Sequence, residues 1–378
     1  MNKIYFDNAA TTPIHPKVIE LIANSMQTVF GNPSSSHQFG RSAKALVETA
    51  RKNIAKRLNV TASEIVFTAG GSEADNMILR NAVDNLGITR IIISKIEHHA
   101  VLHTVIDLKN EKNIKVDYVN LLDDGSIDTQ HLEKLLKNDS SKTLVSLMYI
   151  NNEIGNILDV KTVTRLCQEA NALFHSDAVQ IFGHYNLDLQ EIPIDFVVAS
   201  AHKFHGPKGV GFAYFKKGFG IKPILTGGEQ ERGARAGTEN VHSIIGMEKA
   251  LELAYENLET DKEYIQSLKD YFIEQLKSTI KGIAFNGFTT DAEKSSYVIL
   301  NVRFPIDSAM LLFNLDIKGI AASGGSACQS GSSMGSHVLN EILSLEDAQK
   351  TSVRFSFNKH NTKEEVNFVV AVLKGILG

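Results

Sequence analysis

The first two thirds of the chain alternate between short apolar runs and stretches with helical spacing. Runs such as Ile91-Ile92-Ile93 and Phe196-Val197-Val198-Ala199 are typical of strands that are buried on both faces. In other stretches, such as residues 15–30 and 43–58, the apolar residues recur every three or four positions. Because strands and helices alternate over residues 64–215, the pattern predicts an α/β layered domain with a mostly parallel sheet.

The pattern changes in the C-terminal third of the chain. Two stretches with helical spacing, 241–258 and 261–280, are followed by strand-like runs at 298–302 and 353–357. These runs predict a smaller α+β domain. We therefore expect a large domain over residues 14–258, and a small domain that combines an extended N-terminal arm, 1–13, with residues 259–378.

Composition and charge exclude several classes of function. The 378 residues are 43% hydrophobic and 22% charged, and the net charge of −4 gives no case for binding nucleic acid or an anionic membrane. No apolar run reaches the ~18 residues of a membrane span, and the first residues lack the apolar core of a signal peptide. The two cysteines, Cys167 and Cys328, cannot form a disulfide framework or a thiolate cage for a metal. We expect a cytoplasmic protein without a resident metal, in which Cys167 is buried and inert.

The clearest candidate chemistry follows the apolar strand at residues 196–199. Lys203 comes just after this strand and ahead of the turn-forming Gly206-Pro207, where open α/β sheets place their ligands. In apolar surroundings a lysine amine favours its neutral form, which can form a Schiff base. Asp177 ends the preceding strand, and a lysine with a carboxylate is what pyridoxal phosphate needs for its aldehyde and its ring nitrogen. Taken singly, Lys203 would be a solvated loop lysine and Asp177 a helix cap or an ion-pair partner.

Three earlier strands also end in polar residues. Ser72 follows Gly70-Gly71 at the start of a helix, where free N–H groups and the helix dipole favour a phosphate. His98 follows the strand at 91–93, and Asn152 follows the strand at 144–150. Alone, His98 would be a structural histidine and Asn152 part of a turn. Because strand ends meet at one edge of a parallel sheet, we expect these side chains to converge with Lys203 and Asp177.

Two segments resemble motifs of the cysteine desulfurases, namely His175-Ser176-Asp177-Ala178-Val179-Gln180 and Ser200-Ala201-His202-Lys203 followed by Gly206-Pro207-Lys208-Gly209. These enzymes belong to the class-V aminotransferase family of fold-type I enzymes, and the resemblance extends over nearly the whole chain. It implies an aspartate aminotransferase-like α/β fold, pyridoxal 5'-phosphate as cofactor, L-cysteine as substrate and a homodimer with shared active sites. One departure is Gly71-Ser72, where Ala-Thr is commoner, although the hydroxyl is kept.

The resemblance also implies a role for each site residue. Lys203 is expected to hold the cofactor and to move the substrate Cα proton, assisted by His98, which would stack on the ring. The expected cofactor-binding residues are Gly71, Ser72, His98, Asn152, Asp177, Gln180, Ser200, His202, Lys203 and, across a subunit interface, Thr238. The expected substrate-binding residues are Asn32, Asn152 and Arg354. Arg354 would bind the substrate α-carboxylate, and an internal ion pair is the rival explanation for its place in an apolar strand.

Cys328 lies in a segment of small residues, 321–337, that cannot pack a core, so we expect an exposed and reactive thiol, with an incidental surface thiol as the alternative. The segment resembles the Ser-x-Gly-Ser-Ala-Cys loop of the longer-loop (type I) desulfurases, although Ser333-Met334-Gly335 departs from the usual sequence. The resemblance implies that Cys328 becomes a persulfide as L-alanine leaves. The sulfur would pass to an acceptor or scaffold protein for iron–sulfur cluster assembly or tRNA thiolation, and Cys328 could also ligate a cluster transiently. A selenocysteine lyase and a non-catalytic scaffold of the same fold are the alternatives, and an aminotransferase would not need Cys328.

Overall fold

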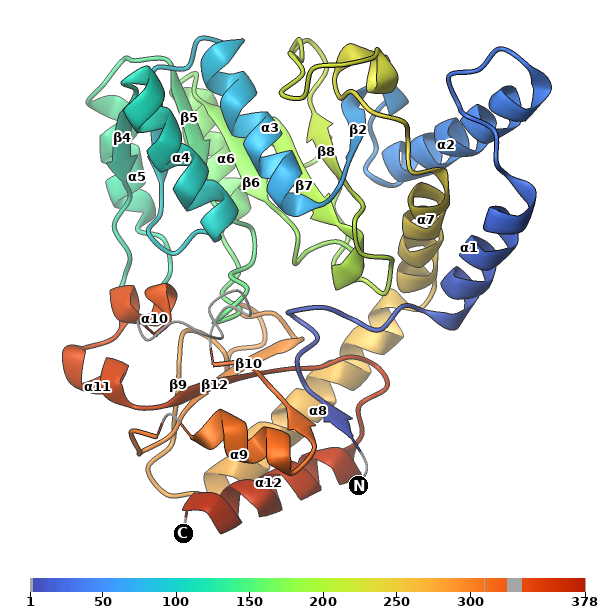
Figure 1. Ribbon diagram of the computed structural model, residues 1–378. Helices are drawn as coiled ribbons and strands as arrows, with labels where there is room; N and C mark the ends of the chain where they lie inside the picture. Colours follow the sequence, from blue (N-terminus) through green and yellow to red (C-terminus); the bar gives the residue numbers. More distant parts are fainter. Residues whose placement is uncertain (1–2, 309, 325–334, 378) are drawn as a thin grey trace.

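The structure is a computed structural model that describes residues 3–308, 310–324 and 335–377 (Figure 1). Cys328 lies outside the described residues. None of the helices in these ranges combines the length and the apolar character that crossing a bilayer requires.

A large sheet of seven strands organises the first two thirds of the chain, in the order β2-β8-β7-β6-β5-β3-β4 (Figure 1). The strands are β2 Ile65–Thr68, β3 Arg90–Ile93, β4 Lys115–Tyr118, β5 Thr143–Ser146, β6 Leu173–Asp177, β7 Phe196–Ser200 and β8 Gly211–Phe215. All neighbours from β7 to β4 pair in parallel, and β8 pairs antiparallel with both β2 and β7. Strands β2, β3, β5, β6 and β7 therefore end at one edge of the sheet. The predicted α/β fold with a mostly parallel sheet is confirmed.

Helices cover both faces of the large sheet. The helices of this part are α1 Pro16–Thr28, α2 Gln38–Arg57, α3 Gly71–Asp84, α4 His99–Lys112, α5 Thr129–Lys137, α6 Val160–Glu169 and α7 Val241–Glu256, with short 3-10 turns η1 Ala62–Glu64, η2 Ala201–Lys203 and η3 Gln230–Gly233. Alternate residues of a strand face different helices, as the twofold repeat of a strand requires. Ile91 and Ile93 pack with α3 and α4, while Ile92 packs in the cluster that includes α2, α6 and α7.

Two small sheets and further helices form the C-terminal part. Strands β9 Ala284–Phe285, β10 Ile299–Arg303 and β12 Ser352–Ser356 form an antiparallel sheet, and β1 Ile4–Tyr5 pairs in parallel with β11 Ile320–Ala321. The helices are α8 Leu258–Thr279, α9 Leu311–Ile317, α10 His337–Ile342, α11 Leu345–Gln349 and α12 Lys363–Leu377. The N-terminal arm is ordered in this part, because β1 is a strand and Asp7 bridges to Ser356.

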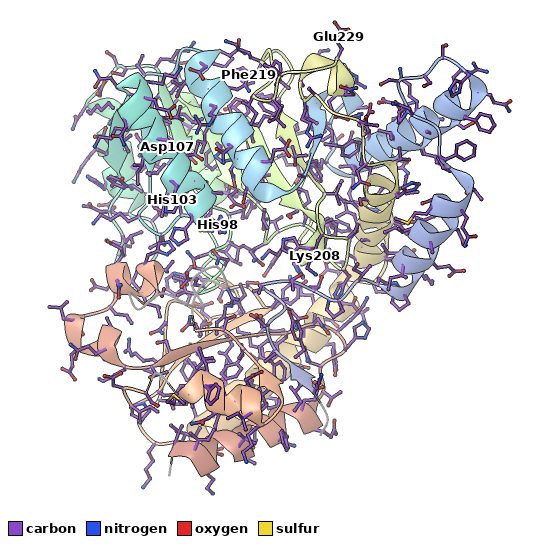
Figure 2. All side chains as sticks on the ribbon, viewed as in Figure 1. His98, His103, Asp107, Lys208, Phe219 and Glu229 are labelled. Carbon is purple, nitrogen blue, oxygen red and sulfur yellow. The ribbon has the colours of Figure 1, made fainter. Side chains whose placement is uncertain are left out.

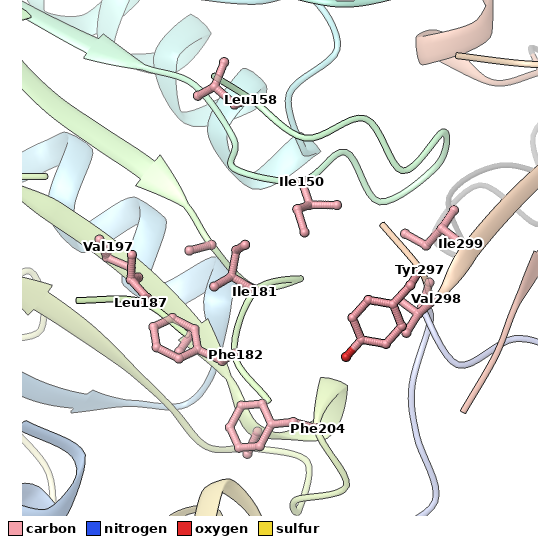
Figure 3. Close-up of a cluster of buried hydrophobic side chains, with 14 of the residues drawn as sticks. Ile150, Leu158, Ile181, Phe182, Leu187, Val197, Phe204, Tyr297, Val298 and Ile299 are labelled. Atoms are coloured by element: carbon pink, nitrogen blue, oxygen red, sulfur yellow. The ribbon is translucent and has the colours of Figure 1, made fainter. Parts of the chain in front are cut away.

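The hydrophobic core is continuous between the two parts. Figure 3 shows Ile150 and Phe204 from the large-sheet part beside Tyr297, Val298 and Ile299 from the C-terminal part, all within one buried cluster. The expected domain boundary at residue 258 falls where α7 gives way to α8, with a single residue between the helices. The division into domains stays a prediction.

Candidate active site

Most of the predicted site residues line one pocket of about 210 Å³ at the carboxyl edge of the large sheet. The pocket is lined by Gly71, Ser72, His98, Asn152, Asp177, Gln180, Ser200, His202, Lys203 and Arg354, together with Ala9, Ala10, Asp75, Met148 and Val179. Figure 2 shows His98 at the end of α4 that faces the C-terminal part. The strand ends therefore converge as the hydrophobic pattern predicted, and Arg354 joins them from a separate sheet.

Lys203 lies in the η2 turn directly after β7. Its Nζ donates hydrogen bonds to the carbonyl oxygens of Ala9, at 2.6 Å, and Ala10, at 2.8 Å. Gln180 Nε2 donates to the same Ala9 oxygen at 3.1 Å. The N-terminal arm thus closes one side of the pocket and brings backbone carbonyls against the lysine.

Asp177 and His98 line the same pocket and lie close to each other. Asp177 is the last residue of β6, and its Oδ1 accepts a hydrogen bond from the Val179 N–H at 3.0 Å. His98 caps α4, because its Nδ1 accepts from the Ala100 N–H at 3.1 Å. Burial lowers the pKa of His98, and the neighbouring Asp177 carboxylate partly opposes this effect. A neutral His98 whose Nδ1 accepts must carry its proton on Nε2.

Asp75, His98 and Asp177 offer oxygen and nitrogen atoms within 4.8 Å of one another. This spacing raises the question of a cation site. The Nδ1 lone pair of His98 is used in capping α4, however, so Nε2 presents a hydrogen rather than a lone pair. Asp75, His98 and Asp177 are therefore better suited to bind an organic ligand whose ring contains a hydrogen-bonding nitrogen than to bind a metal ion.

Sequence reasoning missed Asp75, which lies on α3 and is 1% exposed. Burial raises the pKa of Asp75 well above its usual range, and the nearby carboxylates Asp177 and Glu97 raise it further. Burial beside two carboxylates therefore favours the protonated form of Asp75. The available signal was an acidic residue three positions after Ser72, on a helix face that is otherwise apolar.

The start of α3 lines the pocket through Gly71 and Ser72. The N-cap residue, Gly70, has a φ of 152° and makes no side-chain capping hydrogen bond. The first N–H groups of α3 are therefore open to a ligand, and the helix dipole favours an anion there. A Cβ atom at Gly71 would lie 2.9 Å from Val179 Cγ2, so this loop packs tightly against the turn after Asp177.

Arg354 lies in β12 and its side chain is 1% exposed. Its NH1 donates to the Asn152 carbonyl oxygen at 2.7 Å, and its NH2 donates to Asp7 Oδ1 at 2.9 Å. The internal ion pair considered for Arg354 therefore exists, with Asp7 as partner, and yet Arg354 lines the pocket. Its Nε is buried and has no acceptor within residues 3–308, 310–324 and 335–377.

Three predicted residues are not placed in this pocket. Asn32 is exposed in the loop between α1 and α2, where its Oδ1 accepts from the Ser34 N–H at 2.9 Å. Thr238 lines a separate cavity of about 260 Å³. Cys328 is outside the described residues, and the other cysteine, Cys167, is 1% exposed, with a thiol pKa raised by burial. The roles expected of Asn32, Thr238 and Cys328 stay predictions.

Comparison with known proteins identifies the class. Residues 4–369 match the family model described as aminotransferase class-V, and the chain belongs to that family of pyridoxal-phosphate enzymes. Within the family, the chain belongs with the cysteine desulfurases. It is 39% identical over 380 residues to "Cysteine desulfurase IscS" of Dictyoglomus turgidum, covering 99% of this chain and 94% of the relative.

Solved structures give the same result. A "NIFS-like protein" superposes with a TM-score of 0.91 at 36% identity, covering 100% of this chain and 99% of the other. "SspA in complex with cysteine" superposes with a TM-score of 0.82 at 30% identity, covering 96% of this chain and 100% of the other.

The residues present fit pyridoxal phosphate, the cofactor of this family. A lysine amine, a buried carboxylate and an uncapped helix start share one pocket, and these are the groups that the aldehyde, the ring nitrogen and the phosphate require. The buried Arg354 Nε is a further donor at the same pocket that lacks an acceptor in the described ranges.

Proposed function

We propose that this pocket removes sulfur from L-cysteine, releases L-alanine and leaves the sulfur as a persulfide on Cys328. The proposal rests above all on Lys203 and Asp177 sharing a pocket with Arg354, an arrangement that suits an α-amino acid as substrate. The names of the relatives, "Cysteine desulfurase IscS" and "SspA in complex with cysteine", support the choice of amino acid.

Pyridoxal phosphate supplies an aldehyde for the substrate amine and a ring that withdraws electrons from Cα. Within the protein, Lys203 would hold the aldehyde and then move the Cα proton with its Nζ. The Asp177 carboxylate would face the ring nitrogen, and neutral His98 would lie against the ring and assist proton movement. Asn152 and Gln180 would hold the ring oxygen and the ring edge.

The remaining pocket residues would bind the two charged ends of the bound molecules. Gly71, Ser72, Ser200 and His202 lie near the uncapped start of α3 or in the Lys203 turn, and we assign them to the phosphate. Arg354 would bind the substrate α-carboxylate through its free Nε edge.

The sulfur step balances without an added oxidant. The Cys328 thiolate attacks the substrate sulfur, the S–S bond forms as the Cβ–S bond breaks, and the electron pair left on carbon takes a proton to give alanine. The products are one alanine and one Cys328 persulfide. A thiolate is required because the neutral thiol is a poor nucleophile.

We further propose a cytoplasmic homodimer that passes this sulfur to an acceptor or scaffold protein of iron–sulfur assembly. The position of Thr238 supports the dimer, because it lines a cavity separate from the pocket of its own chain and could serve a second subunit. The iron–sulfur acceptor is suggested by the relatives that carry the name IscS. A role in tRNA thiolation would use the same persulfide.

The test compares wild type with Cys328→Ala, both loaded with pyridoxal phosphate, and measures sulfide and alanine released from L-cysteine. We expect activity in the wild type and its loss in Cys328→Ala, with the cofactor absorbance unchanged. Equal activity in the two proteins would exclude Cys328 as acceptor. A wild type active only on L-selenocysteine would indicate a selenocysteine lyase, and a colourless, inactive protein would indicate a scaffold.

A further inference from the structure

The guanidinium of Arg354 is held at both terminal nitrogens before any ligand arrives. The Asn152 carbonyl accepts from NH1 at 2.7 Å, and Asp7 Oδ1 accepts from NH2 at 2.9 Å. These acceptors come from different parts of the molecule, since Asn152 follows β5 of the large sheet and Asp7 lies in the N-terminal arm. The plane of the guanidinium is fixed by the two contacts together.

One edge of the guanidinium remains available. Nε is buried and lacks an acceptor in the described part of the chain, although the side chain is 1% exposed and lines the cofactor pocket. Each terminal nitrogen carries two hydrogens and uses one in the contacts above. The Nε–H group and the second hydrogen of each terminal nitrogen are therefore the donors left for a further acceptor such as a carboxylate.

Asp7 is itself held firmly. Its Oδ1 also accepts from Ser323 Oγ at 2.8 Å, and its backbone bridges to Ser356. Ser323 in turn pairs through its backbone with Arg354, whose N–H donates to the Ser323 oxygen at 2.6 Å. The carboxylate therefore has a defined position from which to orient the arginine.

We propose that Asp7 is the positioning residue for recognition of the substrate α-carboxylate: it fixes the Arg354 guanidinium so that its Nε edge faces the bound amino acid. The inference rests on the proposed use of the pocket for an α-amino acid. It adds to that proposal a residue that touches neither substrate nor cofactor, and it predicts that Asp7 affects only ligands with a carboxylate.

The test measures equilibrium binding of L-alanine and of ethylamine, which lacks the carboxylate, through the change in cofactor absorbance. Asp7→Ala should weaken L-alanine binding roughly 10- to 100-fold, the loss expected for a hydrogen bond to a charged group, and should leave ethylamine binding unchanged. Asp7→Asn keeps an oxygen that can accept from NH2, so it should stay close to wild type. If Asp7→Ala does not fold, Asp7→Glu, which displaces the carboxylate by one methylene, carries the same expectation.

Asp7→Asn is the matched control, because it changes the same side chain and keeps the acceptor for Arg354 NH2. Ser323→Ala removes one of the contacts that hold Asp7 but leaves the contact with Arg354, so it should weaken L-alanine binding less than Asp7→Ala does. The inference is wrong if Asp7→Ala binds L-alanine as tightly as the wild type, or more tightly, or if it loses ethylamine to the same extent. A wild type that releases no sulfide from L-cysteine would refute the proposed function instead, and the alanine comparison would still decide the role of Asp7.

Discussion

Lys269 offers a quantitative test of how burial affects this protein. It lies on α8, is 1% exposed, and donates from Nζ to the Ser296 carbonyl oxygen at 2.8 Å and to Ser295 Oγ at 3.3 Å. Burial lowers the pKa of Lys269 from 10.5 to about 7, and the charge of Asp270 partly opposes this effect. Between pH 7 and 10.5 the Lys269 amine is therefore mostly neutral in the folded state, whereas it is mostly charged in the unfolded chain.

The size of the effect follows from the two pKa values. A difference of about 3.5 between the folded and unfolded pKa corresponds to ~5 kcal/mol of lost stability, at ~1.36 kcal/mol for each pH unit. Between pH 7 and 10.5 the unfolded state binds more protons, so stability rises with pH over this range, and the loss is complete below pH 7. Replacing Lys269 by Met removes this loss of stability. The substitution also leaves the Ser296 carbonyl oxygen without its hydrogen-bond donor, which destabilises the folded state by ~1–3 kcal/mol.

We therefore expect Lys269→Met to be more stable than wild type by ~2–4 kcal/mol at pH 6, and the difference to shrink as the pH approaches 9. The measurement is the thermal unfolding midpoint of the cofactor-loaded protein from pH 6 to 9, which should rise by several degrees in the variant at pH 6. The control is Lys277→Met on the same helix, where an exposed lysine lies 5.4 Å from the Phe285 ring centroid and the effect should stay below ~1 kcal/mol. The reasoning would be refuted if Lys269→Met unfolded at a lower temperature than wild type at pH 6. It would also be refuted if the difference between the two unfolding midpoints were the same at every pH from 6 to 9.

Two further predictions concern the pocket. Lys203→Ala should abolish both turnover and the absorbance of the protein-linked cofactor, because no other lysine lines the pocket among the described residues. Both are measured after reconstitution with pyridoxal phosphate, and persistent turnover would contradict the role of Lys203. Burial raises the pKa of Glu97 from 4.5 to about 8, so the folded state binds more protons over that range and stability falls as pH rises through it. Glu97→Gln should therefore unfold at a higher temperature than wild type at pH 8, and its unfolding temperature should fall less between pH 4.5 and 8. The prediction is wrong if the unfolding temperature of the variant depends on pH as that of the wild type does.

The sequence determined the sheet and its ligand edge. Short apolar runs with helical stretches between them can bury their surfaces only as a layered, mostly parallel sheet, and such a sheet places its loops at one edge. The sequence alone therefore groups Ser72, His98, Asn152, Asp177 and Lys203 at one edge of the sheet. The spacing of apolar residues is a local property of the chain, so it predicts strands and helices without information about distant contacts.

The tertiary structure alone decided how distant segments complete the pocket. The contacts of Asp7 with Arg354, and of the Ala9 carbonyl with Lys203, join residues that are far apart in sequence and have no shared periodicity. The sequence alone would allow Asp75 to be a surface acid, and only its burial beside Asp177 and Glu97 shows that its pKa is raised. Ion pairing and protonation depend on three-dimensional distance and on exclusion of water, and neither is encoded in the spacing of residues along the chain.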